Sequence, residues 1–229
     1  MTDDIRKRRP FLRWAVALCA LAAGAAWGLS ALYAIRTEGN SAKLLVRAEM
    51  AAAEENWERA SLAYSQYLRR KPDDLDALDA YCRTLMKEIP GNPGRIVNAT
   101  QALRRLIGLF PDRLWPVEEL TGLYLAMGEY GLAEELAADW LEMDPASGGA
   151  PLALAYARNL LHKNREATDT LVEAISQRPD DPALYPLLVK ILAEDRGKPL
   201  EAERWLRQAL RIAPKSESIQ LVAFAFHES

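Results

Sequence analysis

Small, aliphatic and proline positions recur along this chain with a period close to 34 residues. The period is easiest to follow from five prolines, which are spaced by 39, 34, 34 and 35 residues: Pro72, Pro111, Pro145, Pro179 and Pro214. An alanine stands twelve residues before each proline: Ala60, Ala99, Ala133, Ala167 and Ala202. A leucine or isoleucine stands four residues before each proline: Leu68, Ile107, Leu141, Ile175 and Leu210. This pattern predicts an internal repeat of helical hairpins.

The three positions have separate physical roles in a pair of antiparallel helices. A small residue permits close approach where two helices cross, and an aliphatic residue two turns further on fills the groove between neighbours. Proline then ends the helix, because it lacks the amide hydrogen and its ring clashes with the preceding turn. Asp73, Asp112 and Asp180 directly follow three of the prolines. A carboxylate at that position is expected to cap the next helix.

The pattern also predicts where individual helices lie. The first repeat pairs a helix over residues 41–54 with one over residues 57–70, and the second begins with a helix over residues 75–88. An insertion around IPGNPG follows, expected at a hairpin tip because neither helix can continue through it. The third repeat covers residues 114–144. In the fourth, SGGAP is expected to loosen the turn before the next helix.

The end of the repeat region departs from regular helix in two places. In the fifth repeat, Pro182 suits a helix start, but Pro186 conflicts with it, so one of the two must lie outside the regular helix. Residues 216–229 then predict one more helix, which either caps the array or belongs to a longer one. Its buried face is expected to hold Ile219, Val222, Ala223 and Phe226, which leaves Leu221 and Phe224 as apolar surface.

A hairpin repeat of 34 residues with these positions resembles the tetratricopeptide repeat (TPR) family, and the resemblance covers roughly residues 42–215. The third copy meets the family's pattern at Leu120, Tyr124, Gly128, Tyr130, Ala133, Trp140 and Pro145. The tryptophan that the family often carries early in the first helix is replaced here by Leu44, Leu78, Val117, Pro151 and Tyr185, and the proline predicts a late helix start. The resemblance implies an all-α fold, a solenoid of about five helical hairpins plus a C-terminal helix.

A separate segment precedes the repeats. Residues 14–35 carry no formal charge and, as one helix, would span about 33 Å, enough to cross a bilayer. Five basic residues lie in residues 1–13, so this tail is expected in the cytoplasm and the repeats on the other side of the membrane, which in a bacterium is the periplasm. The alternative is a cleaved signal peptide followed by secretion. Residues 36–41 form a short polar linker.

Small residues on the predicted transmembrane helix offer a surface for pairing. Ala20, Gly24 and Gly28 fall four residues apart, and such a stripe lets two helices approach closely. The sequence thus raises self-association as an alternative to binding a different protein.

Composition and charge restrict the function further. The 229 residues carry a net charge of −3, and after residues 1–13 the balance is 24 basic against 30 acidic residues. This balance argues against a nucleic-acid partner, which would require a basic surface. His162 and His227 have no second histidine or cysteine at metal-ligand spacing, and Cys19 and Cys82 predict no disulfide framework. We therefore predict no catalytic, cofactor-binding or metal-binding residues.

The TPR resemblance implies a groove lined by the first helices of the repeats. Its predicted partner-binding residues are Glu49, Asp79, Arg83, Glu118, Tyr156, Asn159, Lys190 and Glu194. Leu45 and Glu49 do not match the Lys/Asn/Arg set with which the family clamps a C-terminal carboxylate. The leading hypothesis is a membrane-tethered scaffold that binds a protein or peptide partner. The alternatives are a self-assembling structural envelope protein and the N-terminal regulatory part of a longer protein.

Overall fold

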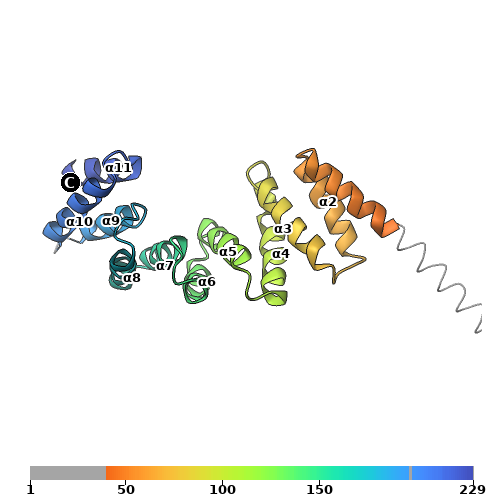
Figure 1. The fold of residues 1–229 in the computed structure, drawn as a ribbon, viewed down its shortest axis with the longest axis horizontal. Helices are drawn as coiled ribbons and strands as arrows, with labels where there is room; N and C mark the ends of the chain where they lie inside the picture. The colour runs from red at the N-terminus through yellow and green to blue at the C-terminus, as the bar shows by residue number, and fades with distance from the viewer. Residues whose placement is uncertain (1–39, 196–197, 229) are drawn as a thin grey trace, which may run out of the picture. The chain divides into compact units, whose positions relative to one another are not determined.

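The computed structural model describes residues 40–195 and 198–228, and all regular structure in these ranges is helical (Figure 1). The chain divides into two compact units, residues 1–88 and residues 89–229. The boundary falls at the IPGNPG insertion. The two helices of the second predicted repeat therefore belong to different units.

The first unit packs three helices around a core of small and aromatic side chains. They are the helix over residues 40–53, α2 (Trp57–Leu68) and α3 (Leu75–Glu88). One cluster of buried residues in this unit consists of Ala48, Ala51, Ala60, Ala63 and Tyr64. Four of the five are alanines, which allow the first two helices to approach closely. The helix bounds agree with the sequence prediction to within two residues.

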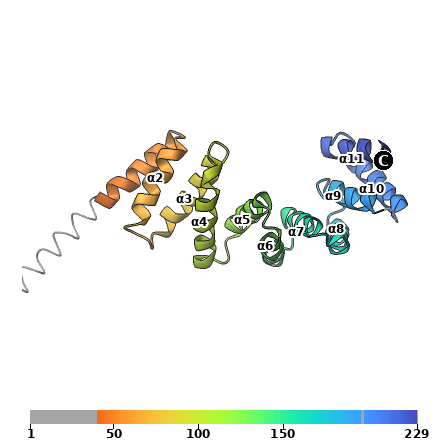
Figure 2. The same ribbon diagram turned by 180° about the vertical axis from the view of Figure 1, so that it is seen from behind.

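The second unit continues the series of antiparallel helices. It contains the 3-10 turn η1 (Pro93–Arg95), α4 (Ile96–Leu109), α5 (Leu114–Met127), α6 (Tyr130–Met143), α7 (Gly149–Leu160), α8 (Asn164–Gln177), α9 (Tyr185–Glu194), α10 (Pro199–Ile212) and α11 (Glu217–Glu228). From α4 onward each helix contacts the next, and α5 also contacts α7 and α9 contacts α11. Figures 1 and 2 show α5 and α7 along one side of this unit and α6 and α8 along the other.

The predicted small positions are confirmed. All five alanines that precede the closing prolines, Ala60, Ala99, Ala133, Ala167 and Ala202, are 0% exposed. The aliphatic positions are covered less completely, because Leu68 and Ile175 are buried whereas Ile107, Leu141 and Leu210 are partly buried. Replacement of the early tryptophan leaves a filled core, since Leu78, Val117 and Tyr185 are all buried.

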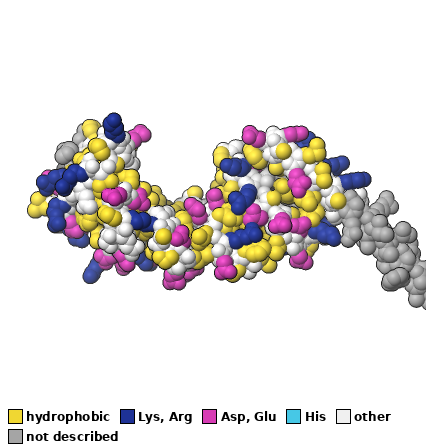
Figure 3. All heavy atoms as spheres, viewed as in Figure 1, with side chains coloured by type: hydrophobic (Ala, Val, Ile, Leu, Met, Phe, Trp, Pro, Cys, Tyr) yellow, Lys and Arg dark blue, Asp and Glu magenta, His cyan; other side chains and the backbone are white. Residues whose placement is uncertain are grey.

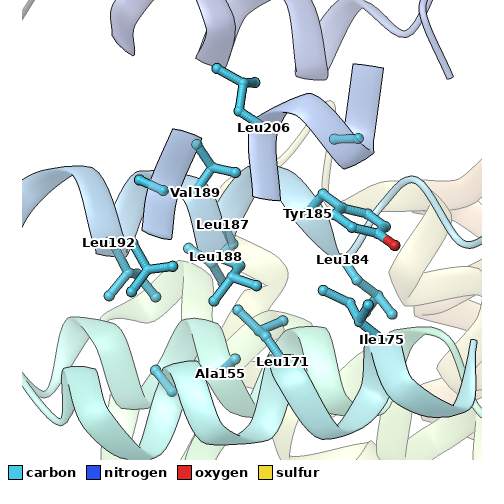
Figure 4. Close-up of a cluster of buried hydrophobic side chains, with 14 of the residues drawn as sticks. Ala155, Leu171, Ile175, Leu184, Tyr185, Leu187, Leu188, Val189, Leu192 and Leu206 are labelled. Carbon is cyan, nitrogen blue, oxygen red and sulfur yellow. The ribbon is translucent and has the colours of Figure 1, made fainter. Parts of the chain in front are cut away.

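The last two repeats share one apolar core, which α11 completes (Figure 4). Leu171 of α8 and Leu188 of α9 are both fully buried there, with Leu206 of α10. Ile219 of α11 is 1% exposed, and Val222, Ala223 and Phe226 pack against the same cluster. The predicted buried face of the C-terminal helix is therefore confirmed. Leu221 and Phe224, off that face, are each 63% exposed.

Three hairpins turn through the same backbone conformation. Glu55, Gly128 and His162 have φ angles of 56°, 78° and 61°, and each lies 17 residues before a closing proline. In the third hairpin Gly128 ends α5, and its amide donates to the carbonyl of Leu125. Only glycine adopts this left-handed region without a steric penalty, so Glu55 and His162 hold it at a cost of about 1–2 kcal/mol each.

The predicted helix caps were wrong in position. The carboxylate that caps α3 is Asp74, one residue after Asp73; its Oδ1 accepts from the amide of Ala77 at 3.0 Å. Asp112 and Asp180 also lie too early in the chain to cap the next helix. The residues directly before α5 and α9 are Arg113 and Leu184, and neither Arg113 nor Leu184 makes a side-chain cap bond. The turn that follows each proline takes up residues before the next helix begins.

Asp74 also joins the end of α2 to the start of α3. The hydroxyl of Tyr67 donates to Asp74 Oδ2 at 2.5 Å. This hydrogen bond to the carboxylate raises the pKa of Tyr67 to about 12 and lowers the pKa of Asp74. One carboxylate thus caps α3 and also binds the last turn of α2 through Tyr67.

The first residues of α7 and α9 show where the prolines of the fourth and fifth repeats lie relative to the helices. Helix α7 begins at Gly149 and holds Pro151 in its first turn, so the expected late start is wrong. Proline is tolerated there because the first amides of a helix have no intrahelical partner. Helix α9 begins at Tyr185 with Pro186 in its first turn, and Pro182 is the one outside.

The described residues contain no helix long and apolar enough to cross a bilayer. The predicted transmembrane helix, residues 14–35, and its pairing stripe Ala20, Gly24 and Gly28 lie outside these residues, as do the basic tail and most of the linker.

Candidate functional site

The predicted groove residues of the first unit include one ion pair. Arg83 Nε donates to Asp79 Oδ2 at 2.8 Å, one helical turn apart on α3. The side chain of Arg83 is 58% exposed and that of Asp79 is 17% exposed. Glu49 is exposed on the helix over residues 40–53. These contacts leave the binding role of the three residues a prediction.

In the second unit, equivalent positions of three successive first helices form a row. Gly122 of α5, Tyr156 of α7 and Lys190 of α9 are 34 residues apart, and all three are exposed. Tyr156 is 45% exposed, whereas nothing lies within 4 Å of a Cβ built on Gly122. The row therefore combines an accessible aromatic ring, a position without a side chain and a positive charge.

The remaining predicted residues flank this row. Glu118 on α5 and Glu194 on α9 are exposed, and Asn159 on α7 is partly buried. Asn159 Nδ2 donates to Asn164 Oδ1 at 3.1 Å, across the turn between α7 and α8. The surface is mixed in charge, and Figure 3 shows acidic and basic side chains interspersed over the visible face of the unit.

A cleft of about 290 Å³ lies between α6, α7 and α8, and sequence analysis did not predict it. Leu141, Pro145, Pro151, Leu154 and Ala174 form its apolar part, and Arg158, Thr170, Glu173, Gln177 and Arg178 form its polar part. Its residues come from two consecutive repeats. The cleft therefore exists only because the two hairpins stack.

An ion-pair network holds the three helices together beside the cleft. Glu134 of α6 accepts from Arg158 Nε at 3.3 Å and from Lys163 Nζ at 2.6 Å. The bond from Lys163, with the nearby Arg158, lowers the pKa of Glu134. Arg158 Nη1 also donates to Thr170 Oγ1 of α8 at 2.6 Å. The charge of Arg158 is thereby compensated.

Arg178 on the same cleft is not compensated. Its Nη1 donates to the carbonyl oxygen of Ala146 at 2.5 Å, and its Nε is buried without a hydrogen-bond partner. Among the described residues, no acidic side chain pairs with it. A buried guanidinium donor that lacks a partner is costly, because its hydration is lost without replacement.

No sequence signal would have found this cleft. Arg158, Glu173 and Arg178 resemble the charged residues of any solvated helix face, and their shared cleft depends on how two repeats stack. The cleft also lies opposite the predicted groove. Leu154 and Tyr156 are two residues apart, about 200° around α7, so they face opposite sides of this helix.

Within the described residues, no group of three or more His, Cys, Asp or Glu side chains is placed to hold a metal ion. The predictions that the chain has no catalytic residues and no cofactor remain predictions.

The chain is similar to solved structures of helical-repeat proteins, although its sequence matches no family model and no protein of curated function. A crystal structure of MamA superposes with a TM-score of 0.65 at 16% identity, over 76% of this chain and 92% of that one. MamA from Desulfovibrio magneticus RS-1 gives 0.63 at 13% identity, over 77% and 97%. TTC0263, a thermophilic TPR protein in Thermus thermophilus, gives 0.55 at 20% identity, over 82% and 100%. The fold is therefore that of a tetratricopeptide repeat protein.

Proposed function

We propose that this chain is a membrane-tethered interaction protein that binds an extended segment of a partner protein along the row Gly122, Tyr156 and Lys190. The observation that carries the proposal is the exposed ring of Tyr156 beside the open surface at Gly122. Tyrosine supplies a large apolar contact with a polar tip, which makes it a frequent anchor of protein interfaces.

The flanking charges suit an extended peptide. Lys190 and the acidic Glu118 and Glu194 lie on helices either side of α7, so a segment that crosses the row meets both signs of charge. Such segments are recognised by a few side-chain anchors with polar contacts around them. The predicted residues of the first unit, Glu49, Asp79 and Arg83, are proposed as partner contacts within that unit.

The tether determines how binding would act. The uncharged stretch over residues 14–35 would confine the repeats to the membrane surface, which raises the effective concentration of partners that meet there. No chemical step is required of the protein. Its function would lie in holding a partner at one face of the membrane.

Site-specific photocrosslinking tests the binding surface. Replacing Tyr156 by p-benzoylphenylalanine keeps an aromatic ring at the centre of the row. The matched control places the same photocrosslinker at Val172 of α8, which is 37% exposed. In the native membrane we expect a discrete adduct from position 156, absent from position 172 and lost when Lys190→Glu is added. Identical adducts from both positions, or none from position 156, would contradict the proposal.

A self-assembling structural protein is the second candidate, favoured by the exposed Leu221 and Phe224 of α11. The same crosslinking experiment separates the two functions. An adduct from position 156 whose mass corresponds to a second copy of this chain would favour self-assembly.

A further inference from the structure

The cleft between α6, α7 and α8 has the composition of a small recognition site. Its volume of about 290 Å³ is at the low end for ligand pockets, and it suits one or two side chains better than a cofactor. Pro145, Pro151 and Leu154 give it an apolar wall, and Arg178 and Glu173 give it charge. The site lies on the face of α7 opposite Tyr156.

The electrostatics of the cleft favour an anion. Arg158 is occupied by Glu134 and Thr170, but within residues 40–195 and 198–228 the side chain of Arg178 makes a single hydrogen bond, to a neutral carbonyl. Guanidinium groups bind carboxylates with paired, charge-assisted hydrogen bonds. Glu173, which lines the same cleft, weakens the attraction for an anion and therefore tunes the affinity.

We propose that this cleft is a second docking site, which binds a carboxylate of a protein partner together with the aliphatic side chain next to it. Arg178 holds the carboxylate, and the wall of Pro145, Pro151 and Leu154 receives the aliphatic group. The proposal is independent of the row around Tyr156, because the two surfaces share no residue.

A purely structural role for Arg178 is the competing explanation. Its bond to Ala146 links the turn after α6 to the end of α8, so removing it would loosen the stacking of two repeats. The test therefore uses two cleft variants with opposite expected effects. Arg178→Gln removes the positive charge, and Glu173→Gln removes the negative one. Arg165→Gln is the matched control, because Arg165 is 91% exposed on α8 and lies outside the cleft.

The probes are the blocked dipeptide acetyl-leucyl-aspartyl-amide and its neutral counterpart acetyl-leucyl-asparaginyl-amide. Acetyl-leucine, which ends in a free carboxylate, distinguishes a chain terminus from an internal acidic residue. Each is titrated into the full-length chain in detergent solution, and binding is followed by NMR at the amides of Thr170 and Ala174 and at the Nε–H of Arg178.

We expect the aspartyl probe to shift the cleft signals and the asparaginyl probe to bind at least about tenfold more weakly, since one charge-assisted bond is lost. Glu173→Gln should tighten binding of the aspartyl probe about two- to fivefold, whereas Arg165→Gln should leave it unchanged. Arg178→Gln should weaken it at least about tenfold. If both dipeptides bind equally, or if Glu173→Gln has no effect, the proposal is overturned, even where Arg178→Gln fails to fold.

Discussion

At the scale of single residues, the hairpin turns show how one backbone requirement is met by different side chains. Glu55, Gly128 and His162 all adopt positive φ at the same position of their repeats. Of these three copies the third alone places glycine there, so the other two hairpins keep their turn because the packed helices on either side determine it. In these three hairpins the packing determines the conformation, and the residue type changes only its energetic cost.

The same substitution at two glycines should therefore have opposite effects. Gly128→Ala forces an L-residue into the left-handed region and should lower the free energy of unfolding by about 1 kcal/mol. A Cβ there would meet only Tyr130, at 3.9 Å, so the cost comes from the backbone and involves no clash. Gly122→Ala, in the interior of α5 with open space around it, should raise stability by about 0.5–1 kcal/mol.

Thermal unfolding followed by circular dichroism measures both changes in the full chain. A third variant, His162→Gly, is the complement, because it relieves the backbone strain and should not destabilise the protein. If Gly128→Ala were as stable as the parent chain, the turn would be adaptable, and positive φ would not be a requirement of this hairpin.

At the scale of the helices, the residues that sequence predicts well are those whose role is set within one hairpin. The five buried alanines and the apolar face of α11 follow from spacing alone, since helical periodicity fixes which side chains share a face. The caps and helix starts depend instead on the length of each turn, which is why Asp74 and Gly149 were missed. The cleft around Arg178 depends on two hairpins at once, and no local pattern encodes it.

Gly149 shows how contact between repeats constrains a single position. It opens α7, and a Cβ built on it would lie 2.6 Å from Cη2 of Trp140, a largely buried ring on α6. The sequence SGGAP suggested a loose turn. The structure instead requires glycine there, so that the backbone of one repeat can lie against the tryptophan of the previous one.

We expect Gly149→Ala to destabilise the second unit by about 1–3 kcal/mol, the usual cost of overpacking a well-filled site. The neighbouring Gly148→Ala is the control, since its Cβ would meet only the carboxylate of Asp181, at 3.2 Å, which can move away. The melting temperature measures both. Adding Trp140→Phe should recover part of the loss in Gly149→Ala, because it removes the ring atoms nearest the new methyl group. A lack of recovery would show that the strain lies elsewhere.

At the scale of the whole molecule, the two predicted modes of action make different demands on the chain. A scaffold needs repeats held at the membrane with their binding row accessible, whereas a self-assembling protein needs complementary surfaces on every copy. The described surfaces supply elements of both: the row around Tyr156 and the exposed pair Leu221 and Phe224. Both modes use the predicted tether, so the side of the membrane on which the repeats lie decides which partners either surface can meet.

The distribution of charge around residues 14–35 predicts that side. Five basic residues precede the stretch, and basic flanks stay in the cytoplasm, so the repeats should lie outside. In bacterial cells we expect protease added to intact spheroplasts to digest the repeats, and the undigested full-length chain to resist extraction from membranes by alkaline carbonate. Extraction of a shortened chain would show that the segment is a cleaved signal peptide. Repeats that are protected until the spheroplasts are lysed would place them in the cytoplasm, where the row around Tyr156 would meet a different set of partners.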